Sequence, residues 1–341
     1  MASGAAAASL GRRELGKSGL VVSQLGLGCM GMSHGLGSAA DRDDKHSVEM
    51  IREAFRLGVT FFDTAECYGP HTNEELLGEA ISTLPRDQLV IATKCGIYFT
   101  PTGAKADSSD ANIRRAIEGS LQRLRTDYVD LYYIHRIDPA VPIEDVARTM
   151  LSLKEAGKIR HWGVSEASVA TIRRAHAVFP LTAVQSEYSL MFREPEAELI
   201  PTLRELGIGF VPYSPLGRGL LTATIDANTK LDATDFRTTL PRFAPENLKQ
   251  NLVLVEAVRA IAARKGATAG QIALAWVMAQ APFIAPIPGT KRLERLVENL
   301  GAAAVHLTPE EVAELTAQAS AITIAGARYG PSLEAMIDRS T

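Results

Sequence analysis

The 341-residue chain has few cysteines, no long apolar run and almost no net charge. Its three cysteines, Cys29, Cys67 and Cys95, form no C-x-x-C pair. This argues against a disulfide framework or a thiolate zinc site and favours a reducing compartment. The longest apolar stretch, residues 272–287, is interrupted by one polar residue and two prolines. It falls short of the roughly 18 apolar residues that a membrane-spanning helix needs.

Opposite charges nearly balance along the chain. Lys and Arg total 36 and Asp and Glu total 39, which gives a formal charge of −3. This composition gives no support to a nucleic-acid binder, which usually carries an excess of basic residues. The alanine-rich start lacks the basic segment of a secretory signal peptide, so we expect a cytoplasmic protein with no membrane partner. With 46% hydrophobic residues, the chain has enough apolar material for a large core.

Eight short apolar runs are spread along the chain, each ending at a polar residue or a glycine-rich turn. They are continuously apolar rather than alternating, which is typical of strands buried on both faces. The runs cover residues 23–28, 60–62, 89–93, 129–134, 161–164, 181–184, 208–213 and 282–288. Apolar residues at i, i+3 and i+4 predict helices over 46–57, 73–82, 112–125, 142–156, 168–178, 194–206, 246–265, 271–280, 293–300 and 309–320. Gly58, Gly157 and Gly207 follow three of these helices, where a left-handed C-cap favours glycine.

The alternation of strand and helix predicts an α/β fold, a closed (β/α)8 TIM barrel, with an open doubly wound sheet as the alternative. Residues 12–22 predict an N-terminal β-hairpin that plugs the lower end of the barrel. A long irregular segment, 216–245, follows the seventh strand, and such a loop is usually functional. We expect a flexible tail over residues 1–9, a single barrel domain over 10–325 and a C-terminal tail over 326–341.

The glycines of residues 26–31 match the pattern G-x-G-x-x-G. A dinucleotide-binding fingerprint opens directly into a helix and has an acidic residue about 20 positions later. Here a loop follows, and the next predicted helix begins only near His46. We therefore interpret the motif as a tight turn whose glycines permit close backbone approach, and not as a Rossmann fold.

Four ionisable residues fall at the carboxyl ends of three successive predicted strands: Asp63, Tyr68, Lys94 and His135. Active sites of barrel enzymes form at this end, and adjacent strands lie only about 4.8 Å apart, so these side chains can converge. Unpaired charges in an apolar barrel mouth are costly. Asp63 and Lys94 are therefore expected to form an ion pair.

This pairing predicts acid–base chemistry. A free tyrosine has a pKa of about 10, and we expect the ammonium of Lys94 to lower the pKa of Tyr68 by stabilising tyrosinate. Asp63 would hold the lysine, and His135 would orient a carbonyl group or share the proton. A buried Asp–Lys pair alone is often only structural. The placement of all four side chains at one rim favours a catalytic role.

Three segments in this region resemble the aldo-keto reductase superfamily: D-T-A-x-x-Y-G at 63–69, T-K at 93–94 and D-L-Y-Y-I-H-R-I-D at 130–138. The segments Q-S-E-Y-S, Y-S-P-L-G-R-G-L-L and I-P-G-T followed by E-N support this, and the resemblance covers residues 10–325. Within the superfamily, G-C-M-G-M-S at 28–33 and P-R-F-x-x-E-N-L, ending at Leu248, resemble the plant auxin-induced-like and perakine-reductase-like branch.

The resemblance implies an oxidoreductase that reduces an aldehyde or ketone with NADPH, the hydride coming from nicotinamide C4. It implies Tyr68 as the proton donor, Lys94 and Asp63 as its tuning pair and His135 as the residue that orients the substrate. It also implies an extended NADPH site: the turn residues Cys29 and Met30, the carboxamide positions Ser165 and Gln185, the stacking residue Tyr213, the pyrophosphate segment Ser214, Leu216, Gly217 and Arg218, and the adenosine-phosphate positions Gly289, Thr290, Lys291, Arg295, Glu298 and Asn299.

Basic residues near the adenosine-phosphate positions independently support a phosphate site there. Lys291, Arg292 and Arg295 crowd the start of a predicted helix after the eighth strand, where TIM barrels commonly bind phosphate. Three cations favour a 2′-phosphate and hence NADP over NAD, whereas a solvated basic helix face is the plainer alternative. The aldose-reductase branch has Lys-Ser where this chain has Gly289-Thr290. This difference leaves open how much of the phosphate binding Lys291 provides.

The expected function is thus carbonyl reduction by a monomer or weak homo-oligomer that uses no metal. An NADPH-sensing regulatory subunit of the channel β-subunit type is the alternative. The three cysteines are interpreted as apolar filler, with a redox-sensitive thiol near Tyr68 or Lys94 as the other hypothesis. Five upper-loop residues are candidates for the substrate pocket: Met30, Met32, Tyr98, Phe99 and Phe236.

Overall fold

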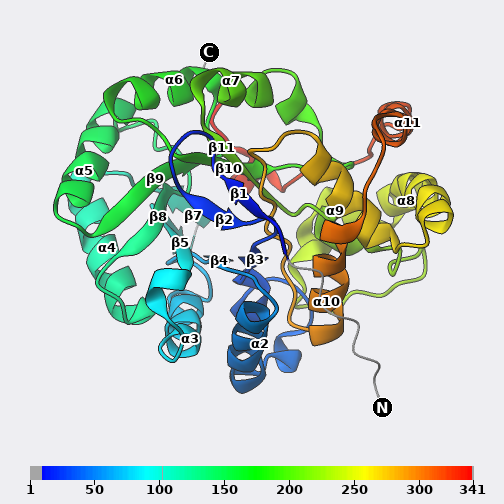
Figure 1. The fold of residues 1–341 in the computed structure, drawn as a ribbon, viewed down its shortest axis with the longest axis horizontal. Helices are drawn as coiled ribbons and strands as arrows, with labels where there is room; N and C mark the ends of the chain where they lie inside the picture. Colours follow the sequence, from blue (N-terminus) through cyan, green and yellow to red (C-terminus); the bar gives the residue numbers. More distant parts are fainter. Residues whose placement is uncertain (1–9, 102, 340–341) are drawn as a thin grey trace.

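Seven parallel strands run side by side around a central axis in the computed structural model (Figure 1). In order around the sheet they are β3 (Leu27–Gly28), β4 (Phe61–Asp63), β5 (Val90–Cys95), β8 (Val129–Ile134), β9 (Ile159–Ser165), β10 (Ala183–Glu187) and β11 (Gly209–Tyr213). The structure describes residues 10–101 and 103–339, so the tail predicted over residues 1–9 lies outside the described residues.

Residues 283–289 close the sheet into a barrel where the eighth strand is predicted. Ala285 and Ile287 donate their amides to carbonyls of β11 at 2.9 and 3.1 Å. Pro286 and Pro288 face the other neighbour, and their carbonyls accept from Gly26 and Gly28, at and just before β3, at 3.0 and 3.3 Å. Because proline has no N–H, Pro286 and Pro288 cannot donate return bonds, and an isolated parallel bridge between Gly28 and Gly289 replaces a continuous ladder, so this strand is incomplete. The predicted (β/α)8 barrel is confirmed.

The predicted N-terminal hairpin is also confirmed. Its strands β1 (Arg12–Glu14) and β2 (Val21–Ser23) pair antiparallel across one end of the barrel (Figure 1). Leu15, Leu20 and Val22 are buried and belong to the same apolar cluster as residues of the barrel interior. The hairpin therefore plugs this end and leaves the other end, the barrel mouth where the strands reach their carboxyl ends, for a site.

Helices surround the barrel, and those from α2 to α11 lie close to predicted positions. They are α1 (Met30–Ser33), α2 (Asp44–Arg56), α3 (Thr72–Ile81), α4 (Asp110–Leu124), α5 (Ile143–Glu155), α6 (Val169–Val178), α7 (Leu199–Leu206), α8 (Pro245–Lys265), α9 (Ala269–Ala279), α10 (Leu293–Gly301), α11 (Pro309–Ser320) and α12 (Pro331–Glu334). Asp43, Ser109 and Ser168 cap α2, α4 and α6 by accepting a backbone amide. Gly157 and Gly207 take the left-handed conformation expected at helix ends, with φ of 74° and 69°.

Three features depart from the sequence predictions. The turn after β3 is not a loop up to His46, because the one-turn helix α1 begins at Met30. The helix predicted over 194–206 is divided into a 3₁₀ turn and α7. An unpredicted antiparallel ribbon, β6 (Ile97–Thr100) with β7 (Gly103–Ala106), stands outside the barrel after β5.

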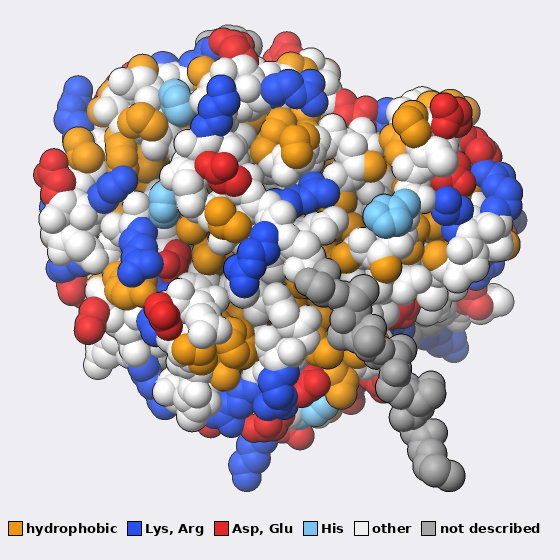
Figure 2. Space-filling model, viewed as in Figure 1, with side chains coloured by type: hydrophobic (Ala, Val, Ile, Leu, Met, Phe, Trp, Pro, Cys, Tyr) orange, Lys and Arg blue, Asp and Glu red, His pale blue; other side chains and the backbone are white. Residues whose placement is uncertain are grey.

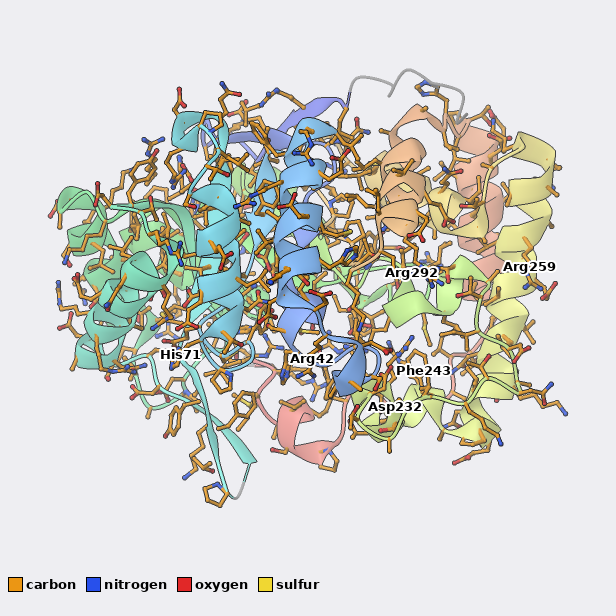
Figure 3. All side chains as sticks on the ribbon, turned by 90° about the horizontal axis from the view of Figure 1, so that it is seen from below. Arg42, His71, Asp232, Phe243, Arg259 and Arg292 are labelled. Atoms are coloured by element: carbon orange, nitrogen blue, oxygen red, sulfur yellow. The ribbon has the colours of Figure 1, made fainter. Side chains whose placement is uncertain are left out.

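The C-terminal segment, residues 326–339, makes extensive contacts with the barrel mouth, which the predicted tail did not anticipate. Arg328 and Tyr329 are buried, and the amide of Asp338 donates to the carbonyl of Glu166 at 3.2 Å. Seen from the side in Figure 3, α12 and the β6–β7 ribbon lie at the end opposite the N-terminal hairpin.

The surface around the hairpin carries interspersed acidic and basic side chains with no large patch of one sign (Figure 2). Among the helices formed by the described residues, none has the length and apolar character required to cross a lipid bilayer.

The tight packing of β9 against its neighbours generates a stability prediction. A Cβ added at Gly163 would lie 2.3 Å from the carbonyl oxygen of Ala183 and 2.6 Å from the ring of Tyr133. We expect Gly163→Ala to lower the free energy of unfolding by about 1–3 kcal/mol or more, measured by urea denaturation. Gly270→Ala is the control, because a Cβ at this position of α9 would lie 3.6 Å or more from its nearest neighbours, which is ordinary contact distance. That change should be neutral or stabilising, since alanine favours helix. Equal losses in the two variants would contradict the packing argument.

Candidate active site

The barrel brings the four predicted catalytic side chains together at its mouth. Asp63 is the last residue of β4 and Lys94 lies near the end of β5. His135 directly follows β8, and Tyr68 stands in the turn that leads from β4 to α3. Because all these strands are parallel and in one continuous sheet, their carboxyl ends meet at the same rim.

Asp63 and Lys94 form the predicted ion pair. Lys94 Nζ lies 2.5 Å from Asp63 Oδ1, with the two side chains 0% and 3% exposed. The ammonium also donates to the carbonyl oxygen of Thr64 at 2.7 Å, and Gln185 Nε2 donates to the second carboxylate oxygen at 2.8 Å. Burial raises the pKa of Asp63, against the opposing effect of the Lys94 charge and of both hydrogen bonds. The ionised form of Asp63 thus depends on Lys94 and Gln185 for its stability.

The phenol of Tyr68 lies beside this pair, 3.3 Å from Lys94 Nζ. The expectation that Lys94 lowers the pKa of Tyr68 is wrong for the protein without ligand. Burial raises this pKa well above its usual value, and the negative charge of Asp63 adds to the rise. Lys94 does not offset this rise, because its ammonium is engaged at shorter distance by Asp63 and Thr64. Tyr68 therefore remains a neutral phenol that can donate its proton.

His135 packs edge-on against Tyr68, with ring centroids 5.7 Å apart. Burial lowers the pKa of His135 well below its usual value, and the charges of Arg136 and Lys94 act in the same direction. The imidazole is thus neutral. Its Nδ1 lies 3.4 Å from Cys67 Sγ. Burial raises the pKa of Cys67 to about 12, so the group is a thiol whose S–H can donate to Nδ1 and leave the ring proton on Nε2.

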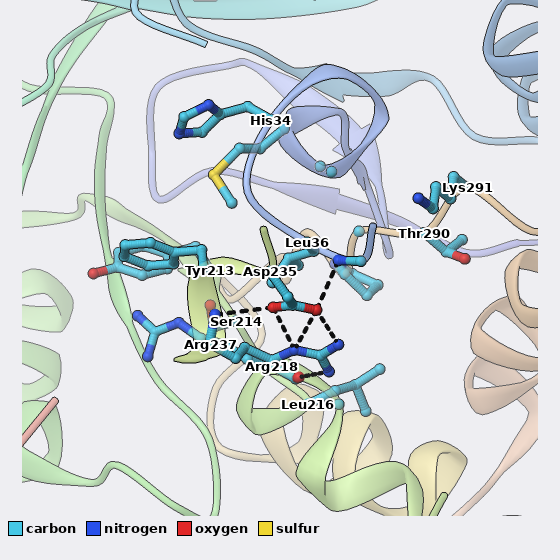
Figure 4. Close-up of a pocket in the computed structure, with 18 of the residues that line it drawn as sticks. His34, Leu36, Tyr213, Ser214, Leu216, Arg218, Asp235, Arg237, Thr290 and Lys291 are labelled. Atoms are coloured by element: carbon cyan, nitrogen blue, oxygen red, sulfur yellow. Dashed lines mark hydrogen bonds and ion pairs between the residues drawn. The ribbon is translucent and has the colours of Figure 1, made fainter. Parts of the chain in front are cut away.

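A cavity of about 970 Å³ extends from these residues along the barrel mouth. This volume lies at the upper end of the range of about 300–1,000 Å³ that is typical of ligand pockets. Figure 4 shows part of its lining, with Tyr213 on one side and Lys291 on the other. Most of the predicted cofactor positions line the cavity: Met30, Ser165, Gln185, Tyr213, Ser214, Leu216, Arg218, Gly289, Thr290, Lys291, Arg295, Glu298 and Asn299. Gly217 is not among the lining residues, and Cys29 is fully buried beneath them.

Three of the five candidate substrate-pocket residues line the cavity and two do not. Met30, Phe99 and Phe236 line the cavity. Met32 is fully buried in the core, and Tyr98 is 45% exposed on the β6–β7 ribbon. Neither of these two lines the cavity, because alternate residues of a ribbon face opposite sides and α1 turns Met32 inward.

The long segment after β11 bridges the cavity to the loop that follows β3. The amide of Phe236 donates to the carbonyl of Gly35 at 2.7 Å, and the amide of Gly37 donates to Asp235 Oδ2 at 2.9 Å. Arg237 holds Asp235 in an ion pair of 2.7 Å, as drawn in Figure 4. The part of the predicted functional loop between Leu216 and Arg237 thus forms one wall of the cavity.

Backbone conformation also marks this wall as a binding site. Ser214, Gly217, Arg218 and Gly219 have positive φ values of 50°, 56°, 54° and 98°. Non-glycine residues rarely adopt this conformation, and it is concentrated at ligand-binding turns. Successive amides in such turns form concavities that bind anions.

A buried cation stands at the far end of the cavity. Lys291 Nζ is inaccessible to solvent and has no hydrogen-bond partner within the described part of the chain. It precedes the N-terminus of α10, beside Arg295, and Figure 4 shows it across the cavity from Tyr213. A buried unpaired ammonium is costly, so this residue fits an anionic group such as a nucleotide phosphate.

The sequence did not reveal an ionic network under the mouth. Glu166 binds Arg328 at 2.6 Å and accepts the hydroxyl of Tyr213 at 2.9 Å. Tyr213 also bonds to Tyr329 at 2.8 Å, so the C-terminal segment is fixed against the cavity wall. Tyr213 belongs to one of the motifs quoted above, but Glu166, Arg328 and Tyr329 lie outside every motif, so no sequence signal marks their ion pair and hydrogen bonds. Over residues 10–101 and 103–339, no group of three His, Cys, Asp or Glu side chains could hold a metal ion.

Comparisons with known proteins give the family. The pattern described as the aldo/keto reductase family matches residues 24–319. This protein belongs to the aldo/keto reductase family, which supports oxidoreduction of small carbonyl compounds with a nicotinamide cofactor.

Solved structures agree over nearly the whole chain. The glycerol dehydrogenase of Gluconobacter oxydans has 27% identity and a TM-score of 0.83, covering 94% of this chain and 98% of that one. A thermostable aldo-keto reductase in complex with the inhibitor epalrestat has 32% identity and a TM-score of 0.74, covering 91% and 100%. An aldo-keto reductase of Bacillus halodurans in its holo form has 27% identity and a TM-score of 0.75, covering 93% and 98%.

The environment of His135 generates a prediction about its protonation. We expect the imidazole to stay neutral between about pH 8 and about pH 6, with its proton on Nε2, as measured by NMR of histidine-labelled protein. The unfolded chain takes up a proton at this residue near pH 6.5 and the folded protein does not. The free energy of unfolding should therefore fall as the pH falls below about 6.5. Cys67→Val removes the S–H donor to Nδ1 and should therefore disturb the tautomer of His135. Titration of His135 near 6.5 would contradict the prediction.

Proposed function

We propose that this protein reduces an aldehyde or ketone to the alcohol with NADPH. One observation carries the proposal. A single cavity has the neutral phenol of Tyr68, in contact with Lys94, at one end and the unpaired ammonium of Lys291 at the other. The first end suits proton transfer to a carbonyl oxygen, and the second suits a phosphate group.

The residues of the mouth have distinct roles in this reaction. Bound NADPH would supply the hydride. Tyr68 donates its proton to the carbonyl oxygen, and the Nε2–H of His135 hydrogen-bonds to the same oxygen and orients it. Lys94 stabilises the negative charge that develops on the phenol oxygen, and Asp63 fixes the position of the ammonium.

The remaining cavity residues suit the rest of the cofactor. The left-handed turn that includes Arg218 suits the pyrophosphate, and Tyr213 suits the nicotinamide ring. Lys291 and Arg295, near the N-terminus of α10, suit the 2′-phosphate, which favours NADPH over NADH. We assign no role in cofactor contact to Cys29, whose side chain is fully buried.

The proposal also covers the branch of the family, the cellular location and the assembly state. The segments at 28–33 and 241–248 support membership of the plant auxin-induced-like and perakine-reductase-like branch. The cysteine content supports a cytoplasmic location. The surface near the hairpin, which mixes charges of both signs, is compatible with a monomer or weak homo-oligomer.

Replacement of the proton donor tests the chemistry. We expect Tyr68→Phe to lower kcat by about a hundredfold to ten-thousandfold, because the hydroxyl that donates the proton is gone. NADPH oxidation at 340 nm with a panel of aldehydes measures the loss, and fluorescence titration should show unchanged NADPH binding. Tyr128→Phe is a matched control, since that ring lies outside the cavity beside Arg86 and Arg160. Full activity of Tyr68→Phe would refute the assigned proton donor.

Replacement of the buried ammonium tests the cofactor. We expect Lys291→Met to weaken NADPH binding about tenfold to a hundredfold while NADH binding changes much less, because only NADPH carries a 2′-phosphate. Binding is measured by fluorescence titration with both cofactors. Lys249→Met, on the exposed side of α8, is the control. Equal losses for the two cofactors would exclude Lys291 from the 2′-phosphate site.

A further inference from the structure

Arg136 is a buried cation at the catalytic end of the cavity. It directly follows His135, lines the cavity and is only 8% exposed. Its Nη1 donates to the carbonyl oxygen of His135 at 2.6 Å and to Ser165 Oγ at 3.2 Å. Both acceptors are uncharged, so neither neutralises the guanidinium. Its other nitrogens have no partner among the residues that the structure describes.

The other buried arginines of this protein show that the situation is unusual. Arg328 and Arg242 are each 6% exposed, and each pairs with a carboxylate, Glu166 at 2.6 Å and Glu187 at 2.9 Å. Arg218, with a side chain 7% exposed, pairs with Glu187 at 3.1 Å. Arg136 has no carboxylate within ion-pair distance in the described chain. An unpaired buried charge is costly, and such charges are concentrated at functional sites.

The charges around the mouth do not balance. Three arginines share the carboxylates of Glu166 and Glu187, so those two acids are already fully engaged. Arg136 adds a further positive charge without an ion pair of its own, because Glu166, which acts on it electrostatically, is already bound to Arg328. Its charge reaches the catalytic phenol, because it opposes the rise that burial and Asp63 cause in the pKa of Tyr68.

We propose that Arg136 binds a carboxylate carried by the substrate, so that the preferred substrates are aldehydes or ketones that also bear a carboxylate group. This inference rests on the proposed reductase function and narrows its substrate class. The planar guanidinium, with free N–H groups, matches a carboxylate in a two-pronged hydrogen bond. Since Arg136 is bonded to the backbone of His135, the bound carboxylate would lie close to the carbonyl that His135 orients.

The cofactor does not supply the negative charge that Arg136 lacks. The cations suited to its phosphates, Arg218 and Lys291, lie elsewhere along the cavity. The nicotinamide carboxamide, which is expected near Ser165, is neutral and can accept a hydrogen bond without compensating the charge. A negative group on the substrate provides the compensation, and it also selects against neutral carbonyl compounds.

A matched pair of substrates tests this proposal. We expect the wild-type protein to prefer 4-carboxybenzaldehyde over methyl 4-formylbenzoate, its uncharged analogue, about tenfold to a hundredfold in kcat/KM. Arg136→Met should abolish this preference, mainly through a higher KM for the acid, and Arg136→Lys should retain part of it. Arg148→Met, on the exposed face of α5 with a side chain 64% exposed, is the control and should keep the wild-type ratio. An unchanged ratio in Arg136→Met, or no wild-type preference, would overturn the proposal.

A binding experiment separates this inference from the reductase proposal. Calorimetric titration of the NADP⁺-bound protein with benzoate, and with benzamide as the uncharged probe, needs no turnover. Benzoate binding that exceeds benzamide binding and is lost in Arg136→Met would support the carboxylate site even if neither aldehyde were reduced. In that case only the proposed reaction would fail. Equal binding of the two probes would reject the site while leaving the reductase proposal intact. NADPH affinity that falls in Arg136→Met as much as benzoate affinity would assign Arg136 to the cofactor instead.

Discussion

The barrel mouth depends on the buried ion pair between Asp63 and Lys94. Neither charge would be stable alone at this depth, because desolvation costs several kcal/mol for each ion. The pair persists since Gln185 holds the second carboxylate oxygen and Thr64 takes another ammonium proton. These bonds join β4, β5 and β10 across the mouth. A one-residue slip of any of these strands would turn its polar side chain to the outer face, so the ion pair and the strand register require each other.

The incomplete eighth strand determines how far the cavity extends across the barrel mouth. Pro286 and Pro288 remove two amide donors, yet their carbonyls still bind the backbone beside β3 and close the barrel. Because of this closure, Gly289 lies against Gly28, so closely that a Cβ on Gly289 would be 2.9 Å from the carbonyl oxygen of Gly28. The chain then leaves the barrel directly into Lys291 and α10. The last strand therefore places a cation beside the first loops, and the cavity can extend across the mouth from there to the catalytic residues.

The sequence predicted the barrel and the catalytic group because both depend on local patterns. Continuous apolar runs mark strands buried on two faces, and the polar residue that ends each run lies at the rim. Other features depend on contacts between distant segments. Tyr329 bonds to Tyr213 from a segment without a motif, and α1 is too short to leave a periodic pattern. The pKa of Tyr68 was predicted in the wrong direction because the sequence shows which charges are near but not how deeply the phenol is buried.

The distribution of charge within the cavity connects stability with ligand binding. Most buried cations of this protein are neutralised by acids, as Arg123 is by Glu74 at 2.7 Å. Lys291 and Arg136 are exceptions in the described chain, and they lie toward opposite ends of one cavity. Neither has an acidic partner within ion-pair distance among the described residues. An anion that binds at either position only in the folded protein also stabilises the fold. Two such positions, with a neutral acid–base group beside one of them, fit the proposed pair of ligands: a cofactor phosphate at one end and a substrate carboxylate near the reacting carbonyl at the other.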